Sequence, residues 1–198
     1  MVKQNNIQTI ILASRSPRRV ELLKQIGIDS IVHPADVDET PLAGESPVDY
    51  VQRVAKQKVM VSAKSLKSGY LHLPVLAADT TVVLDGEILG KPETDADAVK
   101  MLKKLSGSKH AVYTAVAVSL KSKVKVILST TTVEMMPLTD AMIKAYVETG
   151  EQRDKAGSYA IQGKAGAWVA RIEGSYSGVM GLPLFETAKL LRDMSKLA

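Results

Sequence analysis

The stretch IILASRSPRR, residues 10–19, decides how the first part of the chain folds. Its opening apolar residues predict a buried strand, and the residues that follow have the pattern of a helix start. Ser16 suits the N-cap, and Pro17 suits the first helical position, where its missing N–H group costs nothing. Residues 20–26 then supply an apolar face for this helix, and Gly27 is expected to end it.

Arg18 and Arg19 fall in the first turn of this predicted helix, which is an unusual place for cations. The helix dipole already puts partial positive charge there, so each cation is disfavoured by roughly 0.3–1 kcal/mol. A bound anion would reverse this, because free backbone N–H groups and guanidinium forks both bind phosphate. The stretch therefore predicts a phosphate site, and the alternative is a helix start with two solvated arginines.

The composition is that of a globular chain that contains no cysteine. With 198 residues, of which 45% are hydrophobic and 24% charged, we expect a single domain over residues 1–198, with two lobes. No segment reaches the roughly 18 apolar residues that span a bilayer, and the first residues lack the apolar core of a signal peptide. We therefore expect a cytoplasmic location and no membrane partner. The lack of cysteine excludes disulfides, thiolate metal sites and cysteine nucleophiles.

The net charge of +5 is compatible with nucleic-acid binding. However, the lysines are spread along the chain, and only 4% of the residues are aromatic, which leaves few platforms for stacking bases. Mild basicity suits a small polyanion equally well. We therefore expect no stable nucleic-acid partner.

Strands and helices alternate along the rest of the chain. This order predicts an α/β (mixed α+β) fold, in which a bent mixed sheet is flanked by helices. The expected strands lie at residues 30–33, 74–84, 87–89, 111–120, 124–135 and 165–172, and the expected helices at 46–68, 94–107, 139–150 and 183–194.

Asp79 stands inside the apolar strand predicted for residues 74–84. A carboxylate in such a strand is costly unless it is paired, hydrogen-bonded or bound to a metal. The alternative is an aspartate at a bulge that bonds to backbone amides and to Thr80.

Glu39 lies in the acidic turn 36–40, which by itself indicates a solvated loop. With no cysteine and 3 scattered histidines, any metal would be held by oxygen ligands, which favours Mg²⁺ or Mn²⁺.

Other segments indicate less when each is taken alone. Lys58 lies in a predicted helix among other cations, which is typical of a solvated side chain. Asp85-Gly86 is a hairpin turn signal between the strands predicted at residues 74–84 and 87–89. Lys91 follows this hairpin in a Gly-Lys-Pro turn that fixes its position. Gln162, in the run 154–163, could offer a donor and an acceptor to a base edge, or it could belong to a plain glycine-rich connection. Residues 174–183 indicate a second loop in which the backbone comes close to a neighbour.

Several common catalytic motifs are missing from the sequence. It contains no Gly-x-x-x-x-Gly-Lys-Ser/Thr loop, no Gly-x-Gly-x-x-Gly turn, no Gly-x-Ser-x-Gly elbow and no His-Glu-x-x-His helix. Kinases, classical dehydrogenases, serine esterases and zinc proteases are therefore disfavoured.

Five segments occur in an order and spacing that together carry a family resemblance: residues 12–23, 77–80, 90–92, 101–107 and 154–163. They resemble the Maf family of nucleoside triphosphate pyrophosphatases, over nearly the whole chain. The resemblance implies an inosine-triphosphate-pyrophosphatase-like fold with a central cleft between two lobes. It also implies a homodimer that hydrolyses a nucleoside triphosphate to the monophosphate and pyrophosphate with a divalent cation. The last segment resembles the branch that acts on dTTP and UTP.

The resemblance assigns roles to particular residues. Arg15 departs from the family pattern, which often has a small residue or glutamine there. The roles that the resemblance implies are substrate binding for Ser14, Arg18 and Gln162, catalysis for Asp79, Lys91, Lys58 and Arg19, and metal binding for Glu39 and Asp79.

Two alternatives to a dTTP and UTP pyrophosphatase stay open at this point. One is a purine (inosine or xanthosine) triphosphate pyrophosphatase on the same fold. The other is a nucleotide-binding regulator of septation with little turnover. Release of pyrophosphate from a panel of nucleotides would distinguish the three.

Overall fold

The computed structural model describes residues 7–121 and 123–196, which form a mixed sheet with helices on both faces. The sheet is 7-stranded, in the order β2-β1-β3-β5-β6-β7, with β4 paired to β3. This arrangement confirms the predicted α/β class. The strands are β1 (Thr9–Leu12), β2 (Asp29–Val32), β3 (Val75–Leu84), β4 (Glu87–Leu89), β5 (Lys109–Leu120), β6 (Lys123–Met135) and β7 (Val169–Glu173).

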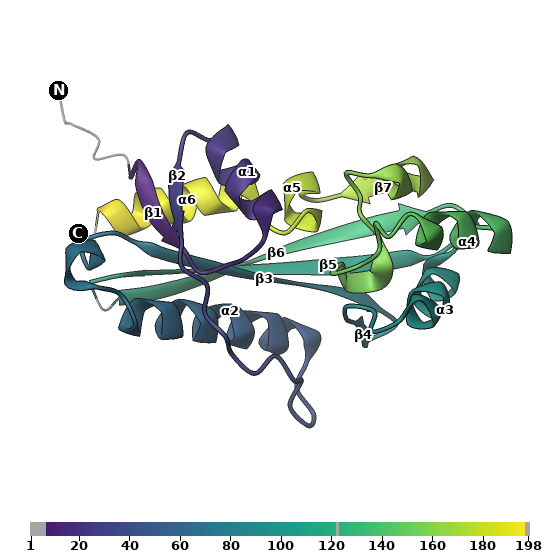
Figure 1. The fold of residues 1–198 in the computed structure, drawn as a ribbon, viewed down its shortest axis with the longest axis horizontal. Coiled ribbons are helices and arrows are strands. Elements are labelled where there is room, and N and C mark those ends of the chain that lie inside the picture. The colour runs from purple at the N-terminus through teal and green to yellow at the C-terminus, as the bar shows by residue number, and fades with distance from the viewer. Residues whose placement is uncertain (1–6, 122, 197–198) are drawn as a thin grey trace.

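Strands β3, β5 and β6 run the length of the molecule, as Figure 1 shows. Strand β1 is parallel to both β2 and β3, whereas the remaining pairs are antiparallel. Asp85 (φ 49°) and Gly86 (φ 82°) form the turn between β3 and β4, and positive φ at both positions is the geometry of a tight hairpin. The Asp-Gly signal in the sequence predicted this turn correctly.

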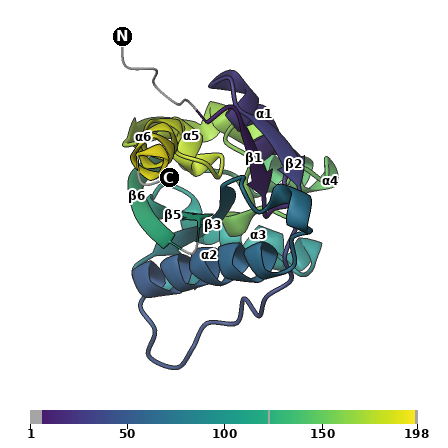
Figure 2. The same cartoon turned by 90° about the vertical axis from the view of Figure 1, so that its left-hand side faces the viewer.

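The helices lie on opposite faces of the sheet. Figures 1 and 2 show α2 on one face and α1 and α6 on the other, while α3 and α4 lie at the far end of the long strands. Within residues 7–121 and 123–196, no helix combines the length and hydropathy needed to cross a bilayer. The helices are α1 (Pro17–Gln25), α2 (Pro47–Lys64), α3 (Asp95–Leu105), α4 (Asp140–Glu148), α5 (Tyr176–Val179) and α6 (Leu184–Ser195).

The central strands are buried on both faces, which explains their nearly continuous apolar sequences. Ile10 and Leu12 of β1 pack with α1 and α6, whereas Ile11 packs with α2, because successive side chains of a strand point to opposite faces. On β3, Val75 and Ala77 also belong to the α2 side. Asp79 continues that alternation, so its carboxylate is directed toward α2.

The structure corrects two expected boundaries and adds one helix. The helix predicted to reach residue 68 ends at Lys64, with Ser65 at its C-cap. Residues 164–168, most of them expected in a strand, form a 3₁₀ helix, and β7 begins only at Val169. A Cβ atom on Gly166 would clash with the carbonyl oxygen of Ile161, and the N–H of Gly166 donates to the Gly163 carbonyl (3.0 Å), so the chain turns here and does not extend as a strand. The short helix α5 was not predicted.

His110 is a buried polar residue in the core at the α3–α4 end of the sheet, with 3% of its surface exposed. Its Nε2 atom lies 2.8 Å from the Tyr159 hydroxyl, and its Nδ1 atom has no hydrogen-bond partner among the described residues. Burial lowers the pKa of His110 from 6.5 to about 4. The folded protein therefore keeps this imidazole neutral at a pH where the unfolded chain protonates it.

This depressed pKa predicts a loss of stability in acid. Between about pH 6.5 and pH 4 the unfolded chain binds a proton that the folded protein does not, so the free energy of unfolding falls with pH. We expect this residue to account for a loss of roughly 2–3 kcal/mol between pH 7 and about pH 4.5, measured by urea unfolding. His110→Gln should remove that part of the pH dependence, and the exposed His72→Gln should keep it. Equal pH dependence in wild type and His110→Gln would contradict this prediction.

Candidate active site

A cavity of about 760 Å³ opens beside the N-terminus of α1. It is lined by the β1–α1 loop, the middle of β3, the segment between β2 and α2, and the loops after β4 and α4. The structure therefore brings every residue assigned in the sequence to one cavity, namely Ser14, Arg18, Arg19, Glu39, Lys58, Asp79, Lys91 and Gln162.

The β1–α1 loop is organised around the hydroxyl of Ser14. Its Oγ atom accepts hydrogen bonds from the backbone N–H of Ser16 (3.2 Å) and from Nη1 of Arg19 (3.1 Å). Ser16 occupies the predicted N-cap position, but its side chain makes no capping bond. The first turn of α1 thus lacks a side-chain cap from Ser16. The arginines of this turn line the cavity, as the phosphate prediction requires.

Arg19 is fixed in place by two protein acceptors. Its Nε donates to the carbonyl of Gly181 (2.9 Å), in addition to the bond from Nη1 to Ser14. Burial lowers the pKa of Arg19, and the negative charge of Asp79 opposes this change. An arginine keeps its proton in such a site, so the cavity holds a fixed, partly desolvated positive charge. Gly181 lies in the loop 174–183, where the sequence predicts that the backbone comes close to a neighbour but does not indicate which residue makes the contact.

Arg18 faces the cavity from the same turn but has no hydrogen-bond partner in the described part of the chain. Burial lowers its pKa, and the charge of Asp154 acts in the opposite direction. Asp154 belongs to the loop that carries Gln162, so Arg18 lies between the helix start and that loop. Its guanidinium is available to a ligand.

Lys58 joins the two acidic residues of the site. Its Nζ lies 2.8 Å from Oδ1 of Asp79 and 2.9 Å from Oε1 of Glu39. Lys58 is 8% exposed and Asp79 is 6% exposed, so this ion pair is buried. The solvated-cation interpretation of Lys58 is therefore wrong, and the lone carboxylate inside β3 is explained by its ammonium partner.

Glu39 is held as a carboxylate by its surroundings. Burial raises the pKa of Glu39, but the hydrogen bond and charge of Lys58, together with the charges of Lys91 and Arg19, outweigh it and keep that pKa below its usual value. The acidic turn is thus not simply a solvated loop, because one of its carboxylates points into the cavity. In Figures 1 and 2, the segment between β2 and α2, which contains this turn, extends past α2.

Asp79 and Glu39 are suitable ligands for a hard divalent cation. Among residues 7–121 and 123–196, no group of three or more His, Cys, Asp or Glu side chains is placed to hold a metal. Mg²⁺ is commonly bound by only one or two carboxylates, with phosphate oxygens and waters completing its shell. The two carboxylates already converge on one cation, the ammonium of Lys58. This donor set fits Mg²⁺ or Mn²⁺ that arrives with a phosphate ligand.

Lys91 and Gln162 lie in two loops that are joined by a backbone hydrogen bond. The backbone N–H of Gly157 donates to the carbonyl of Gly90 (3.1 Å). Gly157 has φ 67°, and a Cβ atom there would lie 3.0 Å from the side chain of Val82, so this close approach requires glycine. The side chains of Lys91 and Gln162 line the cavity without a hydrogen-bond partner among the described residues.

The part of the cavity near Gln162 also has an apolar lining that sequence reasoning did not assign. Ile161 and Tyr159 lie in the Gln162 loop, and Val82, Ile88 and Met180 come from other segments. Apolar walls beside a few polar groups are typical of a pocket for a flat ligand such as a base. Nothing local in the sequence distinguishes these residues from core residues.

Trp168 packs against a residue that holds this loop in place. Its ring lies edge-on to Tyr146, with ring centroids 4.9 Å apart. The hydroxyl of Tyr146 accepts a hydrogen bond from the backbone N–H of Ala160 (3.0 Å). The core of this end of the sheet thus fixes the loop that presents Gln162.

Thr80, next to Asp79, is a further lining residue that sequence reasoning did not single out. The hydroxyl of Thr114 donates to the Gly178 carbonyl (2.8 Å) and lies 3.0 Å from the hydroxyl of Thr80. Since each hydroxyl has one proton, Thr80 must be the donor to Thr114. The Thr80 oxygen therefore offers only lone pairs to a ligand in the cavity, on the face of β3 opposite to the Asp79 carboxylate.

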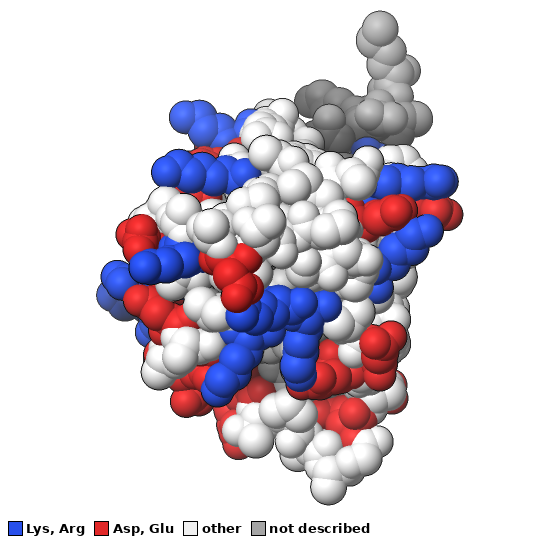
Figure 3. Space-filling view, turned by 90° about the vertical axis from the view of Figure 1, so that its right-hand side faces the viewer, with Lys and Arg blue, Asp and Glu red and all other residues white. Residues whose placement is uncertain are grey.

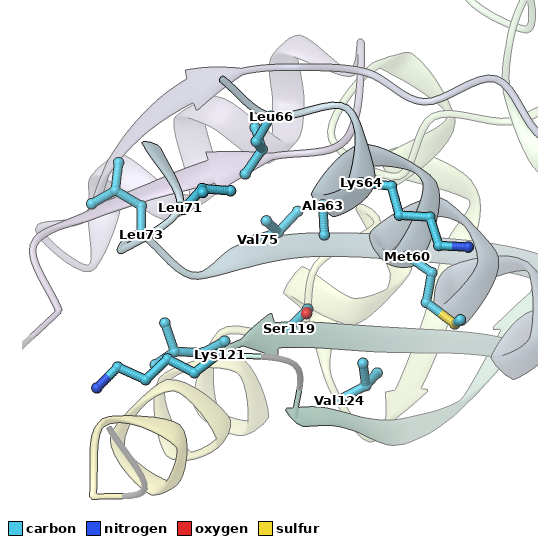
Figure 4. Close-up of a pocket in the computed structure, with 11 residues that line it drawn as sticks. Met60, Ala63, Lys64, Leu66, Leu71, Leu73, Val75, Ser119, Lys121 and Val124 are labelled. Atoms are coloured by element: carbon cyan, nitrogen blue, oxygen red, sulfur yellow. The ribbon is translucent and has the colours of Figure 1, made fainter. Parts of the chain in front are cut away.

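A second cavity, of about 490 Å³, has a different character. Figure 4 shows it between the C-terminal part of α2 and the ends of β3 and β5, with Leu71, Leu73 and Val75 among its lining residues. The charged ends of Lys64 and Lys121 point away from these side chains. Its lining contains no carboxylate and none of the predicted site residues, so it does not carry the phosphate chemistry.

Charges on the surface near α3 and α4 are mixed. Figure 3 shows lysines and arginines lying among aspartates and glutamates on this face. Several of them are paired, as in the contact between Lys104 and Glu87 (2.7 Å). The positive charge of the cavity is therefore a local feature and not part of a basic surface on this face.

The fold and the cavity together define a class of protein. Arginines at a helix start, a buried carboxylate–lysine group and a partly apolar end are the parts of a site for a phosphorylated, base-containing ligand. The chain belongs to the Maf family, since the family model described as Maf-like protein matches residues 9–194.

Curated relatives match nearly the whole chain. The dTTP/UTP pyrophosphatase of Methylobacillus flagellatus is 56% identical over 188 residues, which are 95% of this chain and 94% of that protein. The protein of the same name from Neisseria meningitidis is 44% identical over 191 residues, 95% of each chain. Among solved structures, the Staphylococcus aureus Ham1 protein aligns with a TM-score of 0.46 at 23% identity, covering 64% of this chain and 71% of that one.

Proposed function

We propose that this chain hydrolyses dTTP and UTP to the monophosphate and pyrophosphate in the cavity beside α1. The observation that carries the proposal is the buried Lys58–Asp79 ion pair with Glu39 beside it, which lies in the same cavity as the arginines of the α1 start. The name of the curated relatives, dTTP/UTP pyrophosphatase, supports the same reaction and favours it over the purine and regulator alternatives. The homodimer and the cytoplasmic location stay predictions.

Asp79 is the residue best placed to act on the attacking water. Its carboxylate would take a proton as the water oxygen forms a bond to the α-phosphorus. The bond from the α-phosphorus to the bridging oxygen then breaks, and pyrophosphate leaves with the electron pair. No covalent enzyme intermediate is needed.

The cations of the cavity would stabilise the charge that develops on the leaving pyrophosphate. Arg19, Lys91 and Lys58 all line the cavity, and Arg19 is already fixed by Ser14 and Gly181, so it needs little reorganisation. A divalent cation held by Glu39 and Asp79 would neutralise further phosphate charge when bound. Ser14 and Arg18 would hold the substrate in line for attack.

Gln162 would select the base by offering its amide to the uracil or thymine edge. We expect wild-type protein with Mg²⁺ or Mn²⁺ to release pyrophosphate from dTTP and UTP faster than from CTP, ITP or XTP. Gln162→Ala should reduce the preference for UTP over CTP by a factor of about 10–100, because a paired polar contact is lost. Gln25→Ala, which changes an exposed glutamine outside the cavity, should leave the preference intact.

The same nucleotide panel tests the proposed function. Faster release from ITP or XTP would favour the purine alternative. Nucleotide binding without metal-dependent pyrophosphate production would favour the regulator. An unchanged UTP-to-CTP preference in Gln162→Ala would show that this side chain does not contact the base.

A further inference from the structure

Arg15 and Asp36 form a bidentate ion pair at the rim of the cavity. Nη1 of Arg15 lies 2.6 Å from Oδ1 of Asp36, and Nη2 lies 3.1 Å from Oδ2. Both side chains are exposed, at 67% and 81%, and both residues line the cavity. We propose that Arg15 binds the terminal phosphate of the substrate, and that Asp36 occupies its guanidinium in the free protein. The inference rests on the proposed function.

The sheet order places this pair at the far end of the cavity from the base-selecting loop. The chain after β2 continues beside β1, since the N–H of His33 donates to the carbonyl of Leu12 (2.9 Å). Arg15 follows β1, which pairs with Val75 and Leu76 at the start of β3, and Asp36 follows β2 on the outer side of β1. Strand β4 pairs with the last residues of β3 along the same edge. The Gln162 loop is tied to the segment that follows β4, through the bond between Gly157 and Gly90.

Asp79, in the middle of β3, lies between these two ends. A nucleotide with its base at Gln162 and its α-phosphate at Asp79 would extend its remaining phosphates toward the β1–α1 loop. Arg19 and Ser14 come first along that path, and Arg15 follows at the rim. Arg15 is thus the cation that only a ligand with additional phosphates would reach.

The chemistry of the pair permits an exchange of partners. A guanidinium fork binds a carboxylate and a phosphate with the same parallel N–H···O geometry. An exposed ion pair is worth only about 0.2–1 kcal/mol, so Asp36 is a weak competitor against a phosphate group of higher charge. Asp36 therefore keeps the fork oriented without holding it tightly, and the substrate displaces it.

The experiment measures binding of an α,β-methylene analogue of dTTP, and of dTMP, by calorimetry. Arg15→Ala should weaken binding of the analogue by about tenfold, the loss of one charge-assisted contact, and should leave dTMP binding unchanged. Asp36→Asn should strengthen binding of the analogue by about twofold to fivefold, because the competitor is gone. In the double variant Arg15→Ala/Asp36→Asn this gain should disappear.

The chain offers a matched control in a second arginine–carboxylate pair. Nη2 of Arg171 lies 3.7 Å from a carboxylate oxygen of Glu173, both side chains are exposed, and neither residue lines the cavity. Arg171→Ala should leave the affinity for the analogue unchanged.

Two results would overturn the inference. One is unchanged binding of the analogue to Arg15→Ala, and the other is an equal loss for the analogue and dTMP. Failure of the proposed function is seen separately, because wild-type protein would then release no pyrophosphate from dTTP.

Discussion

The Asp79→Asn variant is expected to release pyrophosphate from dTTP about 10²–10⁴-fold more slowly than wild type. Asparagine keeps the size of the side chain and can still accept a hydrogen bond from Lys58, but it cannot take a proton from water. The loss should therefore fall on kcat, while KM for dTTP changes little. Steady-state assays of pyrophosphate release measure both quantities.

A matched variant separates this effect from a general loss of folding. Asp85→Asn changes an exposed aspartate in the turn directly after β3, where asparagine tolerates the observed φ of 49°. Asp85→Asn should keep wild-type activity, and both variants should show similar thermal unfolding. Activity of Asp79→Asn within about twofold of wild type would remove Asp79 from the mechanism.

The second large effect is expected at Arg19. Arg19→Lys keeps the charge, but a single ammonium cannot bond Ser14 and Gly181 and still present a planar fork to phosphate. We expect kcat/KM for dTTP to fall about 10–100-fold, with changes in both kcat and KM. The measurement is the same pyrophosphate assay over a range of dTTP concentrations.

Arg171→Lys is the matched control for Arg19→Lys, because Arg171 is exposed on β7 and lies outside the cavity. It should behave as wild type. If Arg19→Lys also kept wild-type kcat/KM, the fixed guanidinium would have no part in binding or leaving-group stabilisation.

Much of the fold was predictable because its elements carry local signals. The N-cap residues Ser46, Thr94 and Thr139, which begin three of the predicted helices, all accept bonds from backbone N–H groups, and the Asp-Gly turn joins β3 to β4. Residues 164–168 were predicted wrongly because the chain folds back there, which brings Gly166 against the Ile161 carbonyl outside the segment. No periodicity within that segment records such a contact.

The site was predictable where a residue stands in an unfavourable local position. Asp79 inside an apolar strand and two arginines in a first helical turn both require an explanation from their own neighbours in sequence. Lys58 gave no such signal, because its burial depends on the packing of α2 across β3. The pair of Arg15 with Asp36 depends on the chain after β2 lying beside β1, and composition does not reveal it.

The most direct test of the account is a crystal structure of the slow variant Asp79→Asn with dTTP and Mg²⁺. We expect the triphosphate to lie against Ser14 and Arg19, with the α-phosphorus beside residue 79 and the base against Gln162. A triphosphate bound elsewhere, with residues 14–19 facing bulk solvent, would contradict it.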